Sequence, residues 1–135
     1  MIVDFHSHTV QSDGTLTPAA LLDAMLSRGV CVCSITDHDT LAAYDGLKIP
    51  ASLRVIPGIE INTTYDGNEV HILGYGVSLE DADLHRVLEN NRRARTVRTK
   101  QMVAQLQSAG YDITFEHVVA ESNGGQSLGR PHVGK

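Results

Sequence analysis

The first half of the chain alternates short apolar runs with a helical pattern. Residues 2–5 predict a short strand, and residues 30–35 predict a second one, apolar enough to be covered on both faces as parallel strands are. Between them, apolar residues recur at helical spacing from Pro18 onward. Thr17 is placed to cap the start of this helix, and Gly29 is placed to end it.

Three further elements are predicted before the sequence becomes mainly polar and helical in pattern. Residues 40–47 predict a short helix, and residues 53–61 predict a third strand. Asp66-Gly67 is typical of a hairpin turn, and residues 69–75 predict the returning strand. Strands that alternate with helices predict an α/β fold built on a mostly parallel sheet or barrel.

After Gly76 the pattern becomes mainly helical and polar. Residues 79–109 predict one long, arginine-rich helix that ends at Gly110. A second short helix is expected to start near Thr114, where the pattern Thr-x-x-His resembles a cap only loosely. Residues 122–129 predict a loop.

Composition excludes several classes of protein. The chain has 135 residues, 41% hydrophobic and 20% charged, which argues against both disorder and a membrane span. The first ten residues lack the basic and apolar regions of a secretory signal, so a cytoplasmic protein is predicted. Cys31 and Cys33 stand one residue apart within a strand, which predicts buried thiols and neither a disulfide framework nor a metal site.

Charge is distributed unevenly along the chain. The net charge is −5, yet residues 81–100 are rich in arginine. This basic stretch is the candidate for contact with nucleic acid. The alternative is a solvated helix face, which is what such runs usually are.

The seven histidines are the most informative residues, because most stand beside carboxylates or glycines at predicted strand ends. In an α/β fold, ligand-type residues at the carboxyl ends of successive parallel strands lie close together at one end of the sheet or barrel. The candidate metal ligands are therefore His6, His8, Asp13, His38, Glu60 and His71. His85 and His117 fall on the helical segment and are expected to be ordinary surface residues.

The type of ligand restricts the metal. These candidates offer nitrogen and oxygen without thiolate, which favours manganese, zinc or iron over calcium. More than four candidate ligands imply more than one ion. Clustered ions of this kind activate water and hold a phosphate during its displacement.

Four short motifs resemble those of a known family. They are His6-Ser7-His8 followed by Asp13, then residues 35–39 (ITDHD), residues 57–60 (PGIE), and residues 70–76 (VHILGYG). This combination resembles the PHP (polymerase and histidinol phosphatase) superfamily of metal-dependent phosphoesterases. It is most similar to the stand-alone bacterial subgroup, whose members act on nucleoside monophosphates, 3′,5′-bisphosphonucleotides or the 5′ ends of short RNAs.

The resemblance implies a distorted (β/α)7 barrel with two or three divalent metals at the carboxyl ends of its strands. It also implies a distribution of the ligands. One metal falls to His6, His8 and Glu60, a second to Glu60 and His71, and a third to Asp13 and His38.

The resemblance further divides the chain into parts. Residues 1–78 correspond to the first half of the barrel, residues 79–129 to a helical insertion, and residues 130–135 to the start of the return to the barrel. Arg130 is expected to clamp phosphate, because a guanidinium pairs with two phosphate oxygens. His132 is a further expected catalytic residue.

Two later motifs of the family, a downstream histidine and a final Asp-x-His, do not occur in this sequence. The chain is therefore expected to be truncated, and the 135-residue polypeptide alone to be inactive. The expected reaction of the intact enzyme is hydrolysis of nucleotide phosphate esters by metal-activated water. Two alternatives remain open: a histidinol-phosphate phosphatase-like enzyme and a non-catalytic metal-binding PHP module.

Overall fold

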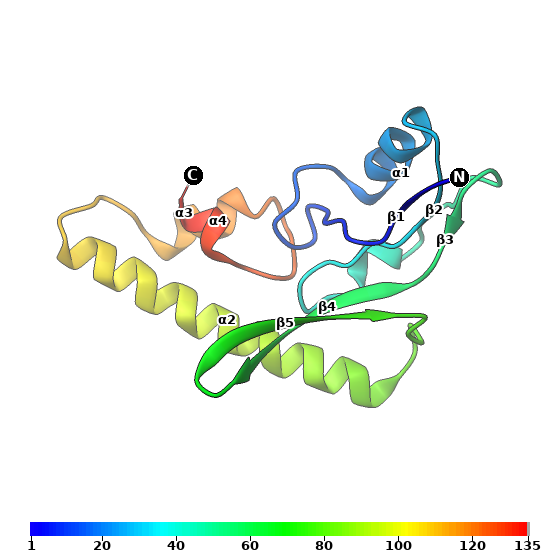
Figure 1. Ribbon diagram of the computed structural model, residues 1–135. Coiled ribbons are helices and arrows are strands. Elements are labelled where there is room, and N and C mark those ends of the chain that lie inside the picture. Colours follow the sequence, from blue (N-terminus) through cyan, green and yellow to red (C-terminus); the bar gives the residue numbers. More distant parts are fainter. Residues whose placement is uncertain (135) are drawn as a thin grey trace.

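A small parallel sheet forms one part of the molecule in the computed structural model, which describes residues 1–134 (Figure 1). Lys135, the last residue of the predicted return segment 130–135, lies outside the described residues. Strands β1 (Ile2–Asp4), β2 (Val30–Cys33) and β3 (Arg54–Val55) lie in that order, with both pairs parallel. The expected α/β fold with parallel strands is confirmed for this part.

Helix α1 (Pro18–Ser27) connects β1 to β2 and begins and ends as the sequence predicts. The Thr17 hydroxyl accepts a hydrogen bond from the Ala20 N–H at 3.3 Å. Pro18 occupies the first turn, where its missing N–H costs nothing. Gly29 follows the helix with a φ of 77°, a conformation that glycine adopts without strain.

The predicted third strand is wrong as a single element, because the chain divides at Pro57. β3 joins the parallel sheet, whereas β4 (Gly58–Tyr65) pairs antiparallel with β5 (Asn68–Tyr75). Proline has no N–H to donate to a ladder, so the strand breaks there. Glu60 therefore lies inside a hairpin strand, and a single parallel bridge to His38 links it to the chain that follows β2.

The hairpin turn itself is confirmed. Asp66 and Gly67 both have positive φ, at 50° and 75°, and Tyr65 pairs with Asn68 across the turn. Two positive φ values match the right-handed twist of the flanking strands, which is why Asp-Gly is favoured there.

The short helix predicted over residues 40–47 is also wrong, since only a 3-10 turn over Ala42–Tyr44 forms. The Thr40 hydroxyl accepts the Ala42 N–H at 3.2 Å, which replaces the first helical hydrogen bond. Asp45 then adopts an extended conformation and ends the turn.

The hydroxyl of Tyr44 joins the parallel sheet to the hairpin. It accepts hydrogen bonds from the N–H of Ile35 at 3.1 Å and of Gly58 at 2.8 Å, and it donates to the Ile35 carbonyl at 2.5 Å. Burial of the ring raises the pKa of Tyr44, so the hydroxyl keeps its proton.

We expect Tyr44→Phe to destabilise the fold by about 2–4 kcal/mol, because two buried N–H groups and one carbonyl lose their partner. Thermal unfolding followed by circular dichroism measures this loss. Tyr65→Phe is the matched control, since that side chain is 79% exposed. Equal melting temperatures for the two variants would mean that the Tyr44 hydroxyl contributes nothing.

Three helices make up the second half of the chain. They are α2 (Ala82–Ser108), α3 (Phe115–Glu121) and α4 (Arg130–Val133). The long helix α2 runs across the β4–β5 hairpin (Figure 1), and the Asn91 amide donates to the Asn62 carbonyl of β4 at 2.9 Å. No helix within residues 1–134 is both long enough and apolar enough to cross a bilayer.

The start of α3 is capped more fully than the sequence suggests. The Thr114 hydroxyl accepts the His117 N–H at 3.2 Å, and His117 Nδ1 accepts the Thr114 N–H at 3.3 Å. His117 is otherwise exposed, as is His85, so the expectation that both are surface residues is confirmed.

Two hydrophobic clusters hold these elements together. The larger packs α1 against β2 and the loop before β3, and its buried members are Leu22, Met25, Val30, Cys33, Ile35, Ala43 and Leu53. The smaller joins the hairpin to the first turns of α2 through Leu41, Ile59 and Leu88. Of the two thiols, Cys33 is buried as predicted, with its pKa raised to about 11 by burial, whereas Cys31 is only half-buried.

Candidate metal centre

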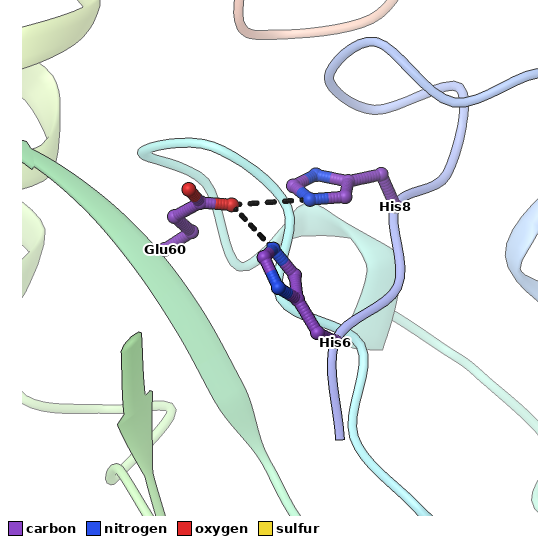
Figure 2. Close-up of side chains that lie close together, drawn as sticks. All are labelled: His6, His8 and Glu60. Atoms are coloured by element: carbon purple, nitrogen blue, oxygen red, sulfur yellow. Dashed lines mark hydrogen bonds and ion pairs between the residues drawn. The ribbon is translucent and has the colours of Figure 1, made fainter. Parts of the chain in front are cut away.

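Glu60 lies at the centre of the predicted ligands. Its side chain extends from β4 and is only 6% exposed. His6 and His8 follow β1, and both rings point at the same carboxylate oxygen (Figure 2). The Oε2 atom of Glu60 lies 2.9 Å from His6 Nε2 and 3.1 Å from His8 Nε2.

Two more histidines lie close to the Glu60 carboxylate, His71 at its other oxygen and His38 at the same one. His71 on β5 pairs with Asn62 in the hairpin, so it shares a face with Glu60 two residues earlier. Its Nδ1 lies 2.7 Å from Glu60 Oε1. His38, in the segment that follows β2, places its Nδ1 3.7 Å from Glu60 Oε2.

Asp13 lies next to two of these histidines. Its Oδ2 is 3.5 Å from His38 Nε2, and its Oδ1 is 3.4 Å from His8 Nδ1. Within the described residues, three groups of ligand atoms each fall inside 4.8 Å: His6, His8 and Glu60; His8, Asp13 and His38; and His38, Glu60 and His71. The structure thus brings together all six side chains that the sequence singles out.

The four imidazoles form a row. Ring centroids are 5.1 Å apart from His6 to His8, 4.7 Å from His8 to His38, and 4.9 Å from His38 to His71. The Nδ1 atom of His38 is buried and has no hydrogen-bond partner among the described residues. A buried nitrogen without a partner, set among carboxylate oxygens, is suited to binding a divalent cation.

The protonation of these groups also suits a cation. Burial lowers the pKa of His8, which favours the neutral ring. Burial alone would raise the pKa of Asp13, but the hydrogen bond and charge of His38 and the charge of His8 outweigh it and bring the pKa to about 2. The pKa of Glu60 is lowered in the same way by His6, His38, His71 and His8, against its own burial. Ionised carboxylates and neutral imidazole are the forms that bind metals.

Asp37 fixes the loop between His8 and Asp13. Its carboxylate is buried and accepts hydrogen bonds from the Thr9 N–H at 2.7 Å, the Thr9 hydroxyl at 2.7 Å and the Ser12 hydroxyl at 2.6 Å. In the sequence, Asp37 stands out only as part of the motif at residues 35–39. Its role in positioning the loop depends on contacts between residues that are 25 to 28 positions apart.

Asp39, on the other side of His38, fastens helix α2 to the centre. Its Oδ2 accepts from Arg95 Nε at 2.6 Å, and its Oδ1 accepts from the Asn91 amide at 2.8 Å and the Asn62 N–H at 3.0 Å. Asp39 is fully buried with a φ of 53°, which aspartate tolerates better than most residues.

A hollow of about 150 Å³ opens beside the histidine row. Its lining includes the ligand-type residues Asp13, His38 and His71 and the three arginines Arg95, Arg98 and Arg130. The structure therefore places Arg130 next to the centre, where the sequence expects it.

His132 is not among the residues that line this hollow. Its side chain is buried elsewhere, in a separate hollow that it shares with Val118 and Glu121. Its Nδ1 accepts the Gly129 N–H at 3.0 Å and so caps α4. The run Gly-Arg-Pro-His carries that signal, with proline in the first turn and a cap partner three residues after the glycine.

The arginines of the basic stretch 81–100 differ in their contacts. Arg93 pairs locally with Glu89 and is 75% exposed, which agrees with a solvated face. Arg98 instead crosses to the hairpin, where its Nη1 lies 2.8 Å from Glu69 Oε1. The hydrogen bond from Arg98 holds the pKa of Glu69 below its usual value. Neither Glu69 nor Arg98 stands out in the sequence, because neither belongs to a motif.

Comparison with known proteins gives the same picture. No protein-family model matches the chain. The 5′-3′ exoribonuclease Rnm of Salmonella typhimurium is 33% identical over 130 residues, which are 93% of this chain and 44% of the relative. A solved structure of a proposed metal-dependent phosphoesterase from Bifidobacterium adolescentis superposes with a TM-score of 0.86 at 34% identity, over 97% of this chain and 47% of that one. The chain is similar to metal-dependent phosphoesterases.

A second curated relative is the 3′,5′-nucleoside bisphosphate phosphatase of Chromobacterium violaceum. It is 30% identical over 133 residues, covering 96% of this chain and 47% of the relative. The chain thus spans less than half the length of these curated relatives. The resemblance drawn from its motifs is confirmed, and the fold corresponds to the N-terminal part of the related structure.

Proposed function

We propose that this chain belongs to a PHP metal-dependent phosphoesterase that hydrolyses phosphate esters of nucleotides or short oligonucleotides. The observation that carries the proposal is one buried carboxylate, Glu60, that lies within 3.7 Å of four imidazoles at the edge of an arginine-lined hollow. The named activities of the two curated relatives support nucleotide or RNA substrates.

The cofactor in this proposal is two or three divalent ions, of manganese, zinc or iron. His6, His8 and Glu60 would hold one ion, Glu60 and His71 a second, and Asp13 and His38 a third, with His8 and His38 close enough to contribute to more than one. Bound ions of this kind lower the pKa of water and polarise phosphoryl oxygens.

The chain's own residues supply the remaining requirements. Arg98 and Arg130 bring positive charge to the hollow where a phosphate would lie. Ser7 stands between two candidate ligands, but its hydroxyl donates to the Ser34 carbonyl at 2.9 Å, which argues against its use as a nucleophile. Direct attack by water therefore fits the centre better than a covalent phosphoenzyme.

A phosphate-release assay tests this function. The full-length protein to which this chain belongs is treated with chelator, loaded with manganese and offered a nucleoside monophosphate, a 3′,5′-bisphosphonucleotide, a short 5′-phosphorylated RNA and histidinol phosphate. Metal-dependent turnover of the nucleotides in preference to histidinol phosphate is the expected result. Preference for histidinol phosphate would support the alternative enzyme, and metal binding without turnover of any ester would support a non-catalytic module.

We expect Arg130→Lys to weaken substrate capture about tenfold in kcat/KM, since lysine keeps the charge but loses the planar pair of donors. Metal content measured by mass spectrometry is expected to stay unchanged. Arg28→Lys is the control, because Arg28 follows α1 and does not line the hollow. A normal kcat/KM in the Arg130 variant would reduce this residue to a surface role.

A further inference from the structure

Arg95 is an unusual arginine, because its guanidinium is buried and only partly used. The side chain is 9% exposed, and its Nε donates to Asp39 Oδ2 at 2.6 Å. Its Nη2 atom is buried and has no hydrogen-bond partner anywhere in residues 1–134. An unpaired buried donor on a charged group is costly, so its retention calls for a ligand.

The position of Arg95 indicates what that ligand is. The side chain lines the same hollow as His38 and Asp13. Its Nη1 atom reaches across to the start of α4, where it lies 3.6 Å from the point that a Cβ on Gly129 would occupy. The guanidinium is therefore fixed at one edge by Asp39, and its Nη2 atom remains without a partner in a residue that lines the hollow.

Three arginines line the hollow, and two of them share one carboxylate. Arg98 and Arg130 both lie near the carboxylate of Glu69, at 2.8 Å and 3.6 Å. One carboxylate thus serves two arginines, while Asp39 serves Arg95 alone. A tetrahedral oxyanion in the hollow would meet three guanidinium groups, of which Arg95 alone has a buried nitrogen without a hydrogen-bond partner in the described residues.

We propose that Arg95 binds the phosphoryl group of the substrate, with Asp39 holding its guanidinium in position. The proposal rests on the phosphoesterase function proposed above and assigns to it a residue on helix α2. Because Asp39 already holds the planar guanidinium in place, little side-chain conformational entropy is lost when Arg95 binds phosphate. Helix α2 then contributes to binding the substrate as well as covering the hairpin.

The test compares phosphate binding by variants that keep the contact with Asp39. Arg95→Lys retains a charge that can pair with Asp39 but has no further nitrogen for the hollow. Arg95→Gln is a second variant, whose neutral amide can donate to Asp39. Arg93→Lys is the matched control, since Arg93 lies on the same helix and is 75% exposed. Circular dichroism establishes that each variant is folded.

Calorimetric titration of inorganic phosphate into the manganese-loaded protein is the measurement. We expect phosphate affinity to fall about tenfold or more in both Arg95 variants and to stay within about twofold in Arg93→Lys, with manganese affinity unchanged in all three. Wild-type affinity in either folded Arg95 variant overturns the inference, as does a wild-type protein that binds manganese but no phosphate. Loss of phosphate binding in a protein that hydrolyses no ester would instead overturn the proposed function and leave the anion site standing.

Discussion

Replacement of Glu60 by glutamine is expected to weaken metal binding at least about a hundredfold and to lower turnover by several orders of magnitude. The amide has nearly the same shape, but it loses the negative charge that lies within 3.7 Å of His6, His8, His38 and His71. Because one carboxylate is common to two of the three ligand groups, the loss affects both. Calorimetry with manganese and mass spectrometry of the bound metal measure it.

Glu80→Gln is the control for this prediction, since Glu80 is exposed just before α2 and makes no ion pair within the described residues. The double variant His6→Ala, His8→Ala provides a second comparison, because it removes two nitrogen ligands from one group and one from another, and leaves the His38, Glu60 and His71 group intact. A Glu60→Gln protein with its full metal complement and normal turnover would refute the assignment of this centre.

The second large effect concerns stability. Asp39→Asn is expected to destabilise the protein by about 3–5 kcal/mol, because Arg95 would keep its charge in a buried position without a counterion. Asparagine tolerates the positive φ of residue 39, so backbone strain does not confuse the result. The melting temperature is expected to fall by about 10 °C or more.

Asp23→Asn is the control for this substitution, since Asp23 is exposed on α1 and does not pair with any arginine in the structure that spans residues 1–134. A melting temperature within about 2 °C of wild type for Asp39→Asn would show that the buried pair adds little to stability. Solvent would then have to reach Arg95 when its partner is neutral.

Local chemistry explains which elements the sequence predicts well. Thr17, Pro18 and Gly29 define α1 because each acts through its own backbone or the next turn. Asp66-Gly67 defines the hairpin for the same reason. The prediction of a single third strand is wrong because Pro57 divides that segment between two sheets. Only the pairing partners of each half show to which sheet it belongs.

The candidate site shows the same division between local and distant signals. Ligand-type residues stand at recognisable positions, and the structure brings all six of them together. Arg95 and Asp39 pair across 56 positions, so neither residue's neighbours in sequence reveal the other. His132 carries an ambiguous signal, since its motif also marks a helix cap, which sequence alone does not separate from a site.

The burial pattern of α2 has a consequence for local opening of the chain. The helix buries Leu88, Arg95, Thr99 and Val103, and none of the side chains of residues 104–108 is buried. Turns that bury little apolar surface open at lower free energy than turns anchored in a core. Backbone amide protons in the last turns of α2 should therefore exchange with deuterium well before those around Arg95. The part of α2 around Arg95 would stay helical, whereas its C-terminal turns would open and close repeatedly.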